Sequence, residues 1–98
     1  MTPHAYRLSL SQPEPPRALS APLAALWWAK KGDWDRAHKL VQDEGGADAA
    51  WVHAYLHRFD GDLGNARYWY ARARQPAASG DLDAEWTAMV EALLAQAA

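Results

Sequence analysis

The sequence contains no cysteine, which excludes disulfide bonds, cysteine-ligated zinc sites and thiol catalysis. It also lacks a run of about 20 apolar residues, the length that a membrane-spanning helix requires. The N-terminal stretch MTPHAYRLSLSQPEPPRAL has no apolar core of the kind found in signal peptides. The formal net charge is only −2, so no excess of basic residues points to nucleic acid. We therefore expect a soluble, cytoplasmic protein that binds neither membranes nor nucleic acid.

The residue patterns of common enzyme sites are also missing. The glycines stand at expected helix ends rather than in a glycine-rich phosphate loop. The serines have no histidine in a recognisable nucleophile context, and most carboxylates stand where they can cap helices. We therefore expect a non-catalytic protein without a cofactor.

Prolines are concentrated in the first 19 residues, at positions 3, 13, 15 and 16. Proline removes a helical N–H and clashes with the preceding turn, and Tyr6, Leu8 and Leu10 alternate with polar residues as in an extended segment. We therefore predict that residues 1–19 form an extended N-terminal arm, which lies over the body of the protein or docks on a partner.

From Ser20 onward the apolar residues follow helical spacing, and no segment has a convincing strand period. Ser20 can cap a first helix that ends at Gly32. Further helices, separated by glycine, aspartate or proline, are expected at residues 34–44, 49–60, 63–74 and 82–97. The sequence therefore predicts one all-α domain over residues 20–98.

The stretches GDWDRAHKL and GDLGNARYW, which begin at Gly32 and Gly61, repeat one pattern at an offset of 29 residues. In each, the glycine can end one helix in the left-handed conformation, and the following aspartate can cap the next. The alanine five positions after the glycine, Ala37 or Ala66, would face the partner helix, where only a small side chain fits. Each pattern predicts the corner of an antiparallel helical hairpin, and two equal hairpins in tandem are typical of an α-solenoid.

At these residues the chain resembles the tetratricopeptide-repeat family. The family's pattern of a corner glycine followed by small and aromatic residues is matched by Gly61, Ala66, Tyr70 and Ala73. The resemblance implies two hairpins with the helix at 82–97 as a C-terminal cap over the open end of the stack. The repeat is shorter than the family's about 34 residues, and two hairpins are fewer than the usual three. The segment WVHAYLHRFDGDLGNARYWYARARQP also resembles short bacterial proteins, which implies no activity.

Two surfaces are candidate peptide-binding sites. A groove between the first and third helices of the stack, lined by Leu26, Trp51 and Tyr55, favours an apolar helix or arm. A basic and aromatic surface comprises Arg58, Arg67, Tyr68 and Arg72. Its guanidinium groups suit acidic or phosphate groups. We therefore expect a small interaction module that binds a peptide or helix of a protein partner. Self-association into a homo-oligomer through exposed tryptophan and leucine is the first alternative.

Metal binding is the second alternative. His53, His57 and Asp60 share one face of the expected helix at 49–60, and two imidazoles one turn apart can chelate Zn²⁺. His38, on the neighbouring helix, can complete such a site. Periodicity turns the histidines outward, whereas the repeat register turns His53 and His57 toward the neighbouring helix. We expect a polar face, or histidines hydrogen-bonded between helices, rather than a metal site.

Overall fold

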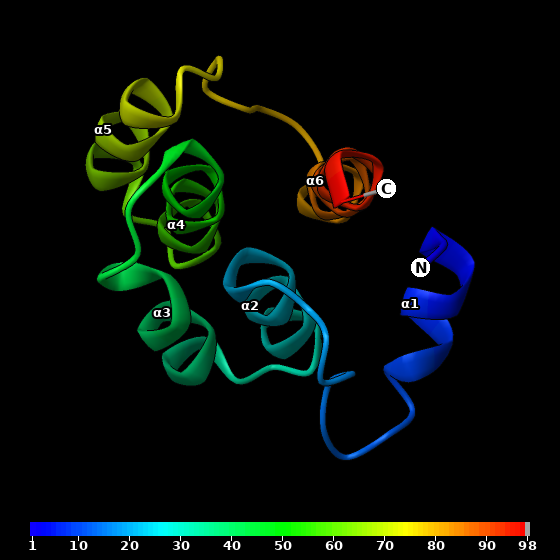
Figure 1. Cartoon of the computed structure of the whole chain (residues 1–98). Coiled ribbons are helices and arrows are strands. Elements are labelled where there is room, and N and C mark those ends of the chain that lie inside the picture. The colour runs from blue at the N-terminus through cyan, green and yellow to red at the C-terminus, as the bar shows by residue number, and fades with distance from the viewer. Residues whose placement is uncertain (98) are drawn as a thin grey trace.

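The computed structural model describes the backbone of residues 1–97 and the side chains of residues 1–96. This part of the chain contains six helices and no strand (Figure 1), which confirms the all-α prediction. The helices are α1 (Pro3–Ser9), α2 (Ala21–Lys30), α3 (Trp34–Gln42), α4 (Ala47–Phe59), α5 (Leu63–Ala73) and α6 (Leu82–Ala97). Every helix expected after Ser20 is therefore present. None of the helices in the described residues is long and apolar enough to cross a membrane.

The N-terminal segment begins with a short helix, so the prediction of an extended arm over residues 1–19 is wrong for α1. Pro3 occupies the first helical position, where its missing N–H leaves no hydrogen bond unmade. The Thr2 side chain caps this helix by accepting a backbone hydrogen bond at 3.0 Å. Tyr6 is fully buried, and its hydroxyl donates to the Leu23 carbonyl at 2.6 Å. Helix α1 is therefore part of the core.

The repeated Gly-Asp pattern forms the two corners that the sequence predicts. Gly32 and Gly61 have φ angles of 89° and 82°, in the left-handed region that glycine adopts without steric cost. The aspartate after each glycine caps the next helix by accepting a hydrogen bond from a backbone N–H. Helix α2 packs against α3, and α4 packs against α5. The small residues Ala37 and Ala66 are buried, so each corner joins two closely packed helices.

Helix α6 does not cover the end of the stack, contrary to the expectation of a terminal cap. Within the described residues it packs against α1, α2 and α4, whereas its backbone stays apart from that of α5. A side-chain hydrogen bond between Tyr70 and Glu85 joins α5 to α6. Its apolar stripe, which includes Trp86, Met89 and Val90, is buried in the main core. The Trp86 indole N–H donates to the Leu26 carbonyl at 2.8 Å.

The linker after α5 carries the chain back across the molecule to α6 (Figure 1). Helix α6 finds apolar partners on α2 and α4, whereas the outer side of α5 carries exposed arginines. Burial of apolar area therefore favours the observed position of α6. As a result, no helix of the described chain covers the outer side of α5.

Candidate functional site

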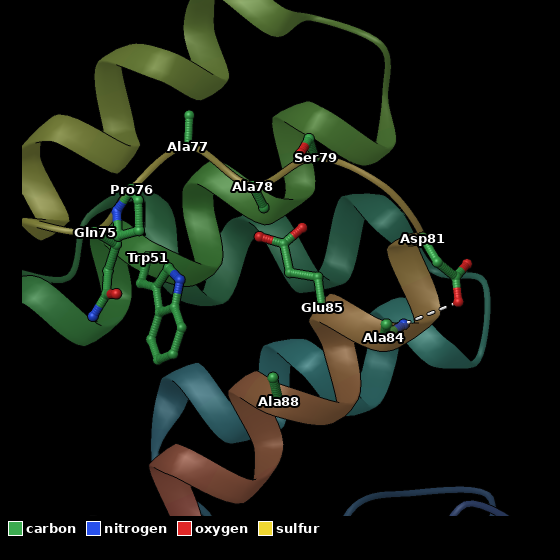
Figure 2. A pocket seen from close by; sticks show the side chains of 10 residues that line it. All are labelled: Trp51, Gln75, Pro76, Ala77, Ala78, Ser79, Asp81, Ala84, Glu85 and Ala88. Atoms are coloured by element: carbon green, nitrogen blue, oxygen red, sulfur yellow. Dashed lines mark hydrogen bonds between the residues drawn. The ribbon is translucent and has the colours of Figure 1, made fainter.

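The groove predicted between the first and third helices of the stack, α2 and α4, is filled by the chain itself. Leu26 and Tyr55 are buried, and α6 packs against both helices that carry them. Trp51 is half-buried and lines a surface pocket between α4, the linker after α5, and α6 (Figure 2). Leu26 and Tyr55 therefore hold the core together and are not available to a partner, which corrects the groove prediction.

Arg58, which was expected on the basic surface, lies inside the molecule instead. Its Nη1 contacts Glu85 Oε1 at 2.7 Å, and the two side chains are only 11% and 8% exposed. Arg58 also donates to the Gly80 carbonyl, and the Tyr70 hydroxyl donates to the second Glu85 oxygen. Burial and this hydrogen bond to Glu85 raise the pKa of Tyr70. Figure 2 shows Glu85 extending from α6 toward the linker. We call these three side chains the Arg58–Glu85 cluster; it ties α4, α5 and α6 together.

The other predicted basic and aromatic residues do lie on the surface, on the outer side of α5. Arg67, Tyr68 and Arg72 are exposed, and 55% of the Tyr68 surface is accessible. The Arg72 guanidinium stands 5.3 Å from the Trp69 ring centroid and donates to the Tyr68 hydroxyl at 3.2 Å. Within the described residues neither Arg67 nor Arg72 forms an ion pair. We call Arg67, Tyr68 and Arg72 the α5 face.

Three histidines meet between α3 and α4. His38 comes from α3, and His53 and His57 come from successive turns of α4. One ligand nitrogen from each lies within 4.8 Å of the others, and His38 Nε2 and His53 Nε2 are 3.0 Å apart. Asp60, the remaining metal candidate, is exposed and does not belong to this group. The repeat register is therefore the correct guide to the histidine orientation, because α4 is surrounded by other helices and has more than one buried face.

Aromatic rings enclose this three-histidine cluster. The His53 ring stacks on Trp69 with centroids 3.9 Å apart, and the His38 ring stacks on Trp34 at 4.7 Å. The spacing of Trp34 and His38, one helical turn apart, is a local signal for the second contact. The stack between His53 and Trp69 joins α4 to α5, and no local pattern in the sequence indicates it.

Burial keeps the histidines of α4 uncharged. Desolvation, with smaller contributions from His38 and His57, lowers the pKa of His53 to about 4. Desolvation also lowers the pKa of His57, although Asp62 and Asp60 act in the opposite direction. Near pH 7 both rings are therefore neutral, and each has a nitrogen lone pair available to a hydrogen-bond donor or a metal ion.

The comparisons with known proteins give no match: no family model, no curated protein and no solved structure matches this chain.

Proposed function

We propose that this protein is a small, non-catalytic interaction module that binds an acidic segment of a partner protein on the α5 face. The observation that carries the proposal is that Arg67 and Arg72 form no ion pair within the described residues and lie beside the exposed Tyr68. The helix that carries them, α5, is covered by α4. Arginine and tyrosine are enriched among the residues that contribute most to binding at protein interfaces.

The arrangement of Arg72 supports recognition of a carboxylate. Its guanidinium lies over the Trp69 and Tyr68 rings, with centroid distances of 5.3 and 5.8 Å. Stacking restricts the side chain before a partner arrives, which lowers the entropic cost of binding. A guanidinium fork binds a carboxylate through two parallel hydrogen bonds. Acidic residues beside an apolar or aromatic residue would therefore complement this face.

We interpret the two hairpins, α2–α3 and α4–α5, as tetratricopeptide-like repeats in tandem. In such arrays each hairpin is covered by the next one, and the end of the stack requires a cap. Helix α6 turns back to α2 and α4 instead of covering α5. The proposed partner segment would occupy the side of α5 that a further repeat covers in longer arrays.

The test is a selection of peptides from a random displayed library against the wild-type protein. We expect enrichment of peptides that combine glutamate or aspartate with an aromatic or aliphatic residue. The variant Arg67→Glu/Arg72→Glu should weaken binding of a selected peptide by at least about tenfold, because repulsion replaces two charge-assisted hydrogen bonds.

A matched control is Arg17→Glu/Lys39→Glu, which changes the net charge equally at two exposed positions away from α5. This control should bind the peptide within about twofold of the wild type when salt screens long-range attraction. Selection of peptides without acidic residues, or equal loss of binding in both variants, would refute the proposal. Light scattering would distinguish self-association from peptide binding. If the mass of the wild type increases with concentration and that of Arg67→Glu/Arg72→Glu does not, the α5 face mediates self-association instead.

A further inference from the structure

We propose that His38, His53 and His57 form a binding site for one divalent transition-metal ion of the Zn²⁺ type, which links α3 to α4. The proposal is independent of the α5 face and goes beyond the proposed interaction function. It rests on the convergence of three imidazole rings and on the buried His53 Nδ1, which has no hydrogen-bond partner among the described residues.

The positions of the nitrogens suit a single small ion. His53 and His57 are four residues apart on α4, the spacing that places two ligands on one helical face. Zinc binds imidazole nitrogen at about 2.0–2.1 Å, so tetrahedral ligands stand about 3.3 Å from one another. One ligand nitrogen from each ring lies within 4.8 Å of the others, and His38 Nε2 and His53 Nε2 are 3.0 Å apart.

The central histidine has a polar atom without a partner. His53 is only 4% exposed, and its Nδ1 is buried with no hydrogen-bond partner among the described residues. Its Nε2 shares one hydrogen bond with His38 Nε2, in which one ring donates and the other accepts. Nearly all buried polar atoms in proteins are paired, and an unpaired one calls for an explanation such as a missing ion. A metal ion at this cluster would be bound by lone pairs of the ring nitrogens. The histidine rings could then form a different set of hydrogen bonds.

The chemistry of the donors selects the class of metal. All three ligands are imidazoles, which suit zinc, copper, nickel and cobalt, whereas magnesium and calcium require oxygen ligands. The cluster includes no carboxylate, because Asp60 is exposed and does not join it. Three protein ligands leave at least one coordination position of the ion for water or another small ligand. The site therefore fits a zinc ion held by three neutral nitrogen ligands, with an open coordination position.

The experiment is a titration of untagged, metal-stripped protein with Zn²⁺, followed by calorimetry and by thermal unfolding. We expect one Zn²⁺ per chain. At a free zinc concentration ten times the dissociation constant, the melting temperature should rise by about 5–10 °C, because the ion binds the folded chain. Tryptophan fluorescence should also change, since Trp69 and Trp34 stack on two of the proposed ligands.

The decisive variants are His38→Gln and His57→Gln, because glutamine keeps a polar side chain at two positions that are less buried than His53. Each should weaken zinc binding by at least about tenfold, since removal of a ligand costs at least as much as removal of a residue that orients one. His4→Gln is the matched control, because His4 is exposed and lies outside the cluster. The proposal would be overturned if the protein does not bind zinc stoichiometrically. It would also be overturned if His4→Gln weakens zinc binding and His38→Gln does not. Circular dichroism of each variant confirms that a loss of binding is not a loss of folding.

Discussion

Helix α4 buries polar side chains on two of its sides, and the two groups differ in how fully they are paired. Toward α6, the Arg58–Glu85 cluster gives each charged group a partner: the carboxylate receives Arg58 and Tyr70, and Arg58 also reaches the Gly80 carbonyl. Toward α3, the three-histidine cluster contains one hydrogen bond between rings, and within the described residues the buried His53 Nδ1 has no partner. The first group is complete within the chain and has a structural role. The second is incomplete, and we propose a metal ion for it.

The largest effect is expected from breaking the complete group. Glu85→Ala leaves the Arg58 guanidinium buried without its carboxylate and removes the acceptor of the Tyr70 hydroxyl. Loss of one partner of a buried ion pair costs about 3–5 kcal/mol. The melting temperature should therefore fall by at least about 10 °C.

Glu91→Ala is the control for this prediction, because Glu91 lies on the same helix and is exposed. It should change the free energy of unfolding by less than about 0.5 kcal/mol. Equal effects of the two substitutions would show that the buried pair does not hold α6 in place.

A smaller effect is expected from acidification of the metal-free protein. The pKa of His53 is lowered to about 4 in the folded chain, while an unperturbed histidine titrates near 6.5. Between these values the unfolded chain binds a proton that the folded chain does not. The stabilising contribution is therefore fully present above about pH 6.5 and is lost as the pH falls toward 4. The free energy of unfolding, measured by urea denaturation, should decrease by about 1 kcal/mol between pH 7.5 and pH 5.5.

The smallest effect is expected from His53→Leu at neutral pH in the absence of metal. Leucine removes the buried Nδ1, which has no partner among the described residues. This gain offsets the lost stack on Trp69 and the lost hydrogen bond to His38. The free energy of unfolding should stay within about 1 kcal/mol of the wild-type value, and its decrease on acidification should become smaller. A loss as large as that of Glu85→Ala would mean that His53 is as completely paired as Arg58, which contradicts the comparison.

The local features of the fold follow from the sequence because each depends on a few neighbouring residues. Each corner, at Gly32 and at Gly61, needs a glycine followed by a capping aspartate, and this pair of residues can be recognised in the sequence. The approach of His53 to His38 agrees with the repeat register, which turns His53 toward the neighbouring helix. Helix α1 does not follow from the same reasoning, because Pro3, which would break a helix in its interior, stands at the first helical position, where proline is tolerated.

The features that depend on residues far apart in the sequence cannot be predicted from local patterns. The position of α6 depends on which apolar surface is largest once α2 and α4 are packed, and no spacing within residues 82–97 encodes that choice. The groove residues Leu26 and Tyr55 were therefore correctly identified as apolar but wrongly assigned to a partner. The sequence groups Arg58 with the arginines of α5, because its carboxylate partner, Glu85, is distant in the sequence.

The most direct test of the proposed metal site is a nitrogen-15 NMR spectrum of the histidine rings, recorded before and after addition of one equivalent of Zn²⁺. The chain has four histidines, so each ring can be followed individually. We predict that the ring nitrogens of His38, His53 and His57 shift together at one equivalent, while those of His4 stay unchanged. Unchanged rings at all four positions, or a shift of His4 equal to the others, would contradict a metal site in the three-histidine cluster.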